Sequence, residues 1–207
     1  MLEKANKKIG IMGGTFNPIH YGHLLLAENA AAQYNLDKIW FMPTGNPPHK
    51  KASDVLDVKD RVEMVSLAIA GNPKFELSLY EAKKNEICYT AQTLSELKEK
   101  YPYYEYYFIM GADSLFDFEQ WNKPNVICEK ASILAAVRDD VKMQELKQQI
   151  KHLKEKYQAS IFELNTPSFS VSSHNIRYRV EKSKTIRYLL PDPVIEYIEK
   201  HHLYKTI

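Results

Sequence analysis

The chain alternates between short apolar segments typical of β-strands and longer segments with helical periodicity. The strand-like segments are 8–12, 38–43, 75–81, 106–111, 132–137 and 160–164. The helical segments are 23–34, 58–70, 90–101, 142–157 and 192–202. Strands separated by helices of this length form βαβ units with right-handed crossovers and a parallel sheet. The sequence therefore predicts an α/β fold with a single Rossmann-like, doubly wound parallel sheet.

Composition limits the partners and the compartment. A chain of 207 residues is long enough for one sizeable core and one domain. Its 28 basic and 26 acidic residues give a net charge of +2, so charge alone indicates no nucleic-acid partner and no membrane surface. Cys88 and Cys128 form no CxxC pair, and no apolar run resembles a signal peptide or a membrane span. These features favour a reduced, cytoplasmic protein.

The helical segment 142–157 carries an apolar stripe. Its members recur at spacings of three and four: Met143, Leu146, Ile150, Leu153 and Tyr157. Such a stripe is typical of a helix packed on its own sheet. The alternative is a seam between two copies, so a homo-oligomer is possible on this pattern.

In an open α/β sheet, ligands bind at the carboxyl ends of the strands. The first strand is followed by GGTFNPIHYGH, residues 13–23, which matches neither of the two common phosphate-binding fingerprints. Gly13 and Gly14 nonetheless leave backbone amides bare, and the next helix presents its positive end to an anion. His20 and His23 can lie on one side of that helix start and donate to phosphate oxygens. The alternatives are a helix cap with surface histidines, or a metal pair.

Loops with hydrogen-bond donors follow the second and third strands. PTGNPPHKK, 43–51, offers Asn46, His49 and Lys50 in a rigid, proline-rich loop. NEICYTAQTLSEL, 85–97, places Tyr89 and Thr90 before a helix, where threonine is a good N-cap. Taken alone, each segment is also consistent with an ordinary loop or cap.

The last three strand ends extend the pattern. GADSLFDFEQW, 111–121, supplies a glycine for close approach, the carboxylate of Asp113 and the ring of Trp121, which could equally be a core residue. Arg138 follows the fifth strand. After the sixth strand, SSHNIR should open a helix with its hydroxyls and guanidinium placed for a polyphosphate, namely Ser172, Ser173 and Arg177.

Two of these segments resemble signatures of the nucleotidylyltransferase superfamily. GGTFNPIHYGH contains its HxGH sequence, and SSHNIR resembles SSTxIR with His174 in place of threonine. The related class I aminoacyl-tRNA synthetases are excluded, since the chain has no KMSKS-like segment and no anticodon-binding half. Within the superfamily the chain is similar to bacterial nicotinate mononucleotide adenylyltransferases, from about Ile9 to Leu203. The resemblance implies one nucleotidylyltransferase domain over 1–207, with a C-terminal helical part from about residue 168 carrying the SSxxxR motif.

The resemblance also implies an activity and a site. The enzyme would join ATP and nicotinate mononucleotide into deamido-NAD in NAD biosynthesis, releasing pyrophosphate. The implied catalytic residues are His20, His23 and Arg177, and ATP would also contact Gly13, Gly14, Thr15, Phe16, Gly111, Asp113, Ser172 and Ser173. The mononucleotide would contact Asn46, His49, Lys50, Tyr89, Thr90, Asp117, Trp121 and Arg138. Mg²⁺ would be carried by the ATP phosphates without a direct protein ligand.

Two alternatives to this activity remain at this point. One is a transferase of the same superfamily that acts on nicotinamide mononucleotide or phosphopantetheine. The other is a catalytically silent nucleotide-binding module.

Overall fold

Six strands form one sheet in the computed structural model, which describes residues 6–47, 55–84, 86–136, 143–167 and 169–205. The strands are β1 (Lys8–Gly14), β2 (Lys38–Pro43), β3 (Phe75–Leu77), β4 (Glu105–Gly111), β5 (Ser132–Ala136) and β6 (Ile161–Leu164). Their order is β3-β2-β1-β4-β5-β6, and every neighbouring pair is parallel. The predicted α/β fold with a parallel sheet is confirmed.

The strand order creates a switch point beside β1. The chain runs from β1 outward to β2 and β3, then returns to the other side of β1 with β4 and continues to β5 and β6. Ile11 of β1 pairs with Phe108 of β4, and Gly13 of β1 pairs with Met42 of β2. In open α/β sheets the crevice for a ligand lies outside the carboxyl ends of the strands at such a point.

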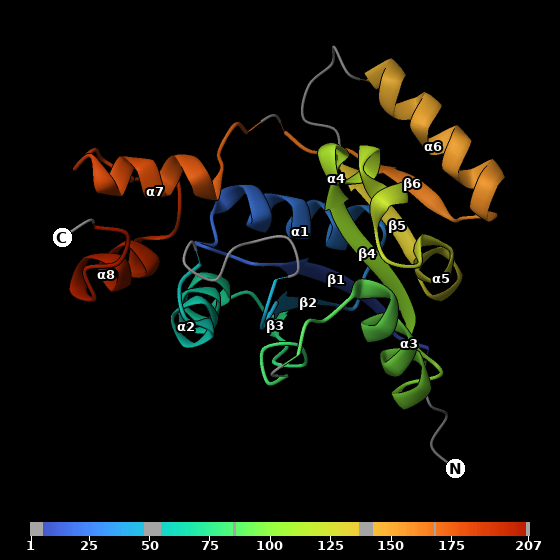
Figure 1. The fold of residues 1–207 in the computed structure, drawn as a ribbon, viewed down its shortest axis with the longest axis horizontal. Coiled ribbons are helices and arrows are strands. Elements are labelled where there is room, and N and C mark those ends of the chain that lie inside the picture. The colour runs from blue at the N-terminus through green and yellow to red at the C-terminus, as the bar shows by residue number, and fades with distance from the viewer. Residues whose placement is uncertain (1–5, 48–54, 85, 137–142, 168, 206–207) are drawn as a thin grey trace.

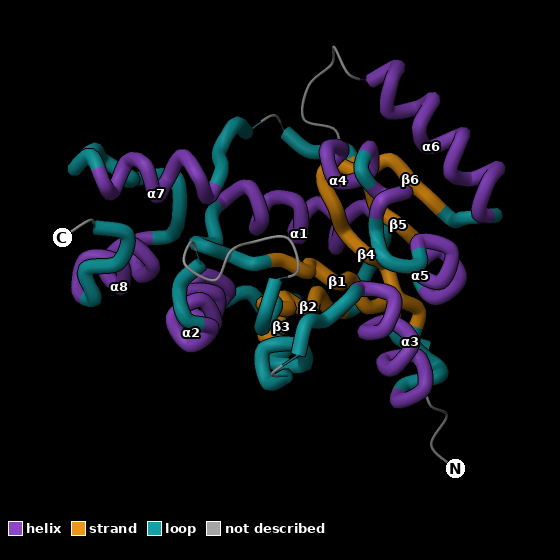
Figure 2. The backbone as a smooth tube through the Cα atoms, viewed as in Figure 1, coloured by secondary structure: helices purple, strands orange, loops and turns teal. Residues whose placement is uncertain are grey.

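Helices cover both faces of the sheet (Figure 1 and Figure 2). One core cluster contains residues of α1 (Tyr21–Gln33), α2 (Val58–Ile69), α7 (Ser173–Glu181) and α8 (Asp192–Lys200). The other contains residues of α3 (Thr90–Lys100), α4 (Ala112–Phe116), α5 (Pro124–Lys130) and α6 (Met143–Tyr157). Neighbouring β1 residues point to opposite clusters, Ile11 to the second and Met12 to the first, as the two-residue period of a strand requires.

The apolar stripe of α6 faces its own protein. Leu146, Ile150 and Leu153 are at most 6% exposed and belong to the core cluster on that face of the sheet. The interpretation as a core face is confirmed, and the alternative of a dimer seam is wrong for these three residues. Within the described ranges, no helix combines the length and the apolar character that crossing a membrane requires.

Two details of the predicted pattern are wrong. β3 ends at Leu77 rather than at residue 81, because the chain enters a turn over residues 80–83. The short helices α4 and α5 lie where the pattern predicted none. They contain 5 and 7 residues, which is too short to produce a clear helical period.

Candidate active site

A cavity of about 260 Å³ lies at the switch point, against the carboxyl ends of β1 and β2 and against Phe108 in the middle of β4. Six residues predicted for the site line it: Gly13, Gly14, Thr15, Tyr89, Thr90 and Trp121. A Cβ atom at Gly13 would meet only the Phe108 ring, at an ordinary 3.5 Å. Packing within the protein therefore does not require glycine there, which agrees with a ligand that approaches the bare backbone.

Trp121 forms an aromatic wall of this cavity. Its ring is half-buried and packs edge-on against Phe108, with centroids 6.0 Å apart, and against Phe118 at 5.8 Å. Trp121 packs on the core, as one interpretation predicts, and it also lines the cavity, whereas its stacking on a ligand stays a prediction. A ring held in this way can stack on a flat, electron-poor heterocycle.

The start of α3 forms a second wall. The structure places Tyr89 at the N-cap with extended backbone, whereas Thr90 is already the first helical residue, so the predicted cap at Thr90 is wrong by one position. Tyr89, Thr90 and Thr93 all line the cavity. The positive end of a helix is a suitable receptor for a carboxylate.

His20 and His23 lie together at the start of α1, as predicted. Their rings stack with centroids 3.8 Å apart, and His20 is 3% exposed. The His20 backbone N–H donates to Nδ1 of His23 over 3.3 Å. Because this nitrogen accepts, the proton of the neutral imidazole is on Nε2, which makes Nε2 a donor. A Cβ at Gly22 would come within 3.0 Å of the His20 ring, which explains the glycine of the HxGH sequence.

Hydrogen bonds join the two signatures of the sequence. Ser172 caps α7 by accepting from the Asn175 N–H at 3.2 Å. The Ser173 hydroxyl donates to the Pro18 carbonyl at 2.8 Å, and Arg177 donates to the Asn17 carbonyl at 2.9 Å. The predicted helix start at Ser172 and Ser173 is confirmed. The N-terminal part of α7 lies beside the loop that leads to the histidine pair.

Other predicted residues lie apart from the cavity lining or outside the described chain. Gly111 ends β4 and caps α4, where Asp113 is exposed in the first turn. Asp117 and Asn46 are also exposed, and Asn46 forms an isolated bridge with Ile87. His49, Lys50 and Arg138 are not among the described residues.

Arg61 supports the site from outside the cavity lining, and the sequence motifs did not indicate it. It is 1% exposed and donates to the carbonyls of Thr15 at 2.9 Å, Thr44 at 2.7 Å, Gly45 at 2.9 Å and Leu56 at 3.0 Å. It therefore ties the loop after β1 to the loop after β2. Burial lowers the pKa of this guanidinium from its ordinary value. The available signal was a charged residue on the buried stripe of α2, in line with Met64 and Val65.

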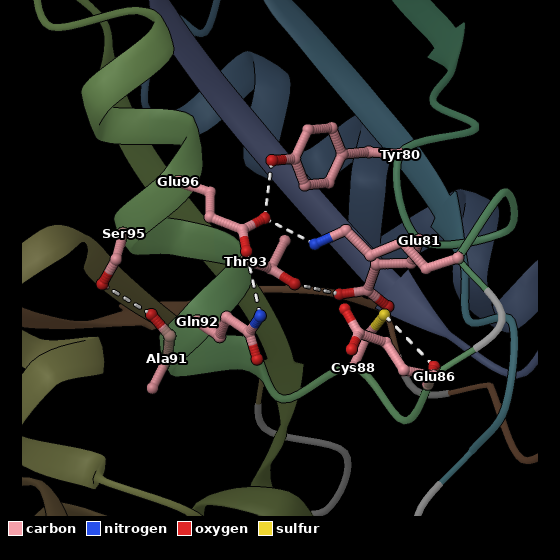
Figure 3. Close-up of polar contacts among 10 residues, drawn as sticks. Tyr80, Glu81, Glu86, Cys88, Ala91, Gln92, Thr93, Ser95 and Glu96 are labelled. Carbon is pink, nitrogen blue, oxygen red and sulfur yellow. Dashed lines mark hydrogen bonds and ion pairs between the residues drawn. The ribbon is translucent and has the colours of Figure 1, made fainter.

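Two carboxylates fasten α3 to residues 80–84, which comprise the turn after β3 and Lys84 (Figure 3). Glu81 lines the cavity, is 8% exposed and accepts from the Thr93 hydroxyl at 2.7 Å. Glu96 accepts from the Tyr80 hydroxyl at 2.7 Å and from the Lys84 ammonium. Burial raises the pKa of Glu81, whereas the bonds from Lys84 and Tyr80 lower the pKa of Glu96 to about 2.

We expect Glu96→Gln to lose stability in a pH-dependent way. The pKa of Glu96 is about 2 in the folded protein and 4.5 ordinarily, so its contribution is present above pH 4.5 and is lost as the pH falls towards 2. The variant should melt roughly 2 °C below the wild type at pH 7, a small effect because the pair is partly exposed. Thermal melts between pH 2 and pH 7 measure whether this gap closes in acid.

Glu81→Gln provides the contrast, because the pKa of the wild-type Glu81 carboxyl is shifted upward. Ionising the buried Glu81 carboxyl costs stability as the pH rises past its ordinary pKa of 4.5. The stability of this variant relative to the wild type should therefore rise with pH, opposite to the trend for Glu96→Gln. The same trend in both variants would contradict the two assignments.

The fold and this site define the chain as a nucleotidyltransferase. The model of the cytidylyltransferase-like family matches residues 11–179. A protein of Lachnoclostridium phytofermentans named "Probable nicotinate-nucleotide adenylyltransferase" is 48% identical over 198 residues, 96% of this chain and 99% of its own. A protein of the same name from Desulfitobacterium hafniense is 42% identical and covers 96% of both chains. The chain belongs to the nicotinate-nucleotide adenylyltransferase family.

A solved structure shares the fold. Nicotinic acid mononucleotide adenylyltransferase of Plasmodium falciparum, complexed with NaAD, superposes with a TM-score of 0.79 over 96% of this chain and 98% of that one. The two sequences are 22% identical, so the likeness concerns the fold alone.

Proposed function

We propose that this chain transfers the adenylyl group of ATP to nicotinate mononucleotide, giving deamido-NAD and pyrophosphate in NAD biosynthesis. The observation that carries the proposal is the cavity at the switch point. It places the ring of Trp121 and the start of α3 beside Gly13, Gly14 and Thr15. A pyridine ring with a carboxylate fits the first two features, and a phosphate fits the bare backbone at the end of β1.

The chemistry needs no general base. The 5′-phosphate of the mononucleotide is already largely a dianion at pH 7, since the second pKa of a phosphate monoester is about 6. It attacks the α-phosphorus of ATP in line, and the bond from that phosphorus to the bridging oxygen of pyrophosphate breaks. Catalysis then consists of positioning and of stabilising the charge that develops on the phosphate oxygens.

We assign the ATP phosphates to His20 and His23, and the departing pyrophosphate to Arg177. The remaining ATP contacts are Gly13, Gly14, Thr15, Phe16, Gly111, Asp113, Ser172 and Ser173. The mononucleotide is assigned to Tyr89, Thr90 and Trp121 in the cavity wall, and to Asn46, His49, Lys50, Asp117 and Arg138 by the family resemblance. The two signatures are joined by the hydrogen bonds of Ser173 and Arg177, which supports a shared role.

Mg²⁺ is part of the proposal as a companion of ATP. The groups named at the joined signatures are imidazoles, hydroxyls and a guanidinium, whereas proteins bind Mg²⁺ through carboxylates and substrate phosphates and leave it several waters. We therefore assign the ion to the phosphate oxygens of ATP, where it neutralises negative charge. We also propose a cytoplasmic location and a single domain over 1–207. Self-association is a further proposal, which gel filtration would measure.

Assays of one protein preparation with three acceptors test the proposed function. ATP and Mg²⁺ are supplied with nicotinate mononucleotide, nicotinamide mononucleotide or phosphopantetheine, and pyrophosphate release is measured. We expect the highest kcat/KM with nicotinate mononucleotide. A higher value with another acceptor would move the assignment to that substrate, and ATP binding without pyrophosphate release would indicate a silent nucleotide-binding module.

A further inference from the structure

Side-chain donors bind the backbone carbonyls of the loop between β1 and the histidine pair. Arg61 donates to the Thr15 carbonyl at 2.9 Å, Arg177 to the Asn17 carbonyl at 2.9 Å and Ser173 to the Pro18 carbonyl at 2.8 Å. These donors come from α2 and α7, which lie far apart in sequence. Three of the four backbone carbonyls from Thr15 to Pro18 therefore accept a hydrogen bond from a side chain of α2 or α7.

This loop contains a strained residue. Phe16 has φ of +49°, a left-handed conformation that side chains other than glycine rarely adopt. Such a conformation is strained and persists only where its surroundings determine it. The Phe16 ring is 2% exposed and packs edge-on against His23, with centroids 5.1 Å apart. A change in the loop would therefore be transmitted to a histidine of the site.

Asn17 connects this loop to the end of the chain. Its side chain is 1% exposed, and its Oδ1 accepts from the Tyr204 hydroxyl at 2.9 Å and from the Leu56 N–H at 3.4 Å. Tyr204 follows α8 and is 187 positions away in sequence. Burial raises the pKa of the Tyr204 phenol, while the nearby cations Arg177 and Arg61 oppose that shift. The hydroxyl therefore stays protonated, and a donor, at neutral pH.

We propose that Tyr204 is a positioning residue for adenylyl transfer, whose hydroxyl fixes Asn17 and thereby the loop that places His20 and His23. The expected change in kcat rests on the proposed function, whereas the role of the Tyr204 hydroxyl in holding the loop does not depend on it. The Tyr204 hydroxyl bonds to Asn17, so its effect on the histidines passes through the Asn17 side chain and the strained Phe16. Misplacement of a positioned group by about 1 Å can cost up to 10²-fold in rate.

The chain offers a matched control for the test. The Tyr197 hydroxyl, on α8, donates to Asp60 Oδ1 at 2.9 Å and is also partly buried. Tyr204→Phe and Tyr197→Phe each remove one such hydroxyl and keep the ring. We expect Tyr204→Phe to lower kcat about tenfold with the KM for nicotinate mononucleotide within about twofold, because its cavity wall is intact. Tyr197→Phe should keep the wild-type kcat.

Amide hydrogen exchange in the substrate-free proteins separates the inference from the proposed function. We expect the backbone amides of residues 13–17 to exchange faster in Tyr204→Phe and at the wild-type rate in Tyr197→Phe. If exchange and kcat are the same in both variants, the inference is wrong. If exchange differs as expected but the wild type releases no pyrophosphate with nicotinate mononucleotide, the proposed function is wrong and the role of Tyr204 in fixing the loop stands.

Discussion

His23→Ala should lower kcat/KM for ATP by about 10²–10³, the usual cost of removing one well-placed donor to a developing oxyanion. The reason is the orientation of the ring, since the His20 N–H bonds to Nδ1, so that Nε2 carries the proton of the neutral ring and can donate it to a phosphate oxygen. The substitution also removes the stacking partner of His20, 3.8 Å away. Steady-state pyrophosphate release, with both substrates varied, measures the loss.

Two conservative variants test which nitrogen matters. The amide nitrogen of Gln can occupy nearly the place of Nε2, whereas Asn reproduces only the position of Nδ1. If the Nε2 proton is the catalytic donor, His23→Gln should retain more activity than His23→Asn, and His23→Asn should resemble His23→Ala. The reverse order would contradict the orientation assigned to the ring.

His152→Ala serves as the control for the loss of a histidine. His152 is an exposed residue of α6 that contacts Glu119 over 3.3 Å, and it lies outside the site. Its replacement should leave turnover within about twofold, as expected for a surface substitution. Near-normal turnover of a folded His23→Ala protein would remove this residue from the mechanism.

The sequence predicted the parts of this protein that depend on local pattern. The six strands, five of the helices and the position of the site at the strand ends all follow from apolar periodicity and from one rule about parallel sheets. The glycine-rich turn and the SSHNIR segment are equally local. Each segment predicts the start of a helix from residues that lie close together in the chain.

The supporting residues could not be predicted in the same way. Arg61 and Tyr204 act on the loop after β1 through contacts between segments 46 and 187 positions apart. Such pairings appear only when the chain is folded, because neither residue belongs to a motif. Arg61 gave a partial signal as a cation on a buried stripe, whereas nothing local marked Tyr204 or Asn17 as partners.

The largest effect in the second signature is expected for Arg177. Arg177→Ala should lower kcat by about 10²–10³, because a guanidinium that neutralises the departing pyrophosphate contributes mainly in the transition state. Arg179→Ala is the matched control on the same helix. Arg179 bonds to Asn175 and to the Thr185 carbonyl rather than to the loop, and its loss should change turnover about twofold or less.

The size of the Arg177 effect distinguishes two roles, because this side chain also donates to the Asn17 carbonyl. If it only positioned the loop, Arg177→Ala would resemble Tyr204→Phe, with a loss of about tenfold. A loss of about 10²–10³ that Arg177→Lys partly restores requires charge at the leaving group, since lysine keeps the cation but not the planar fork. The reverse reaction gives an independent measure. When deamido-NAD and pyrophosphate are supplied, Arg177→Ala should raise the KM for pyrophosphate, whereas Tyr204→Phe should leave it near the wild-type value.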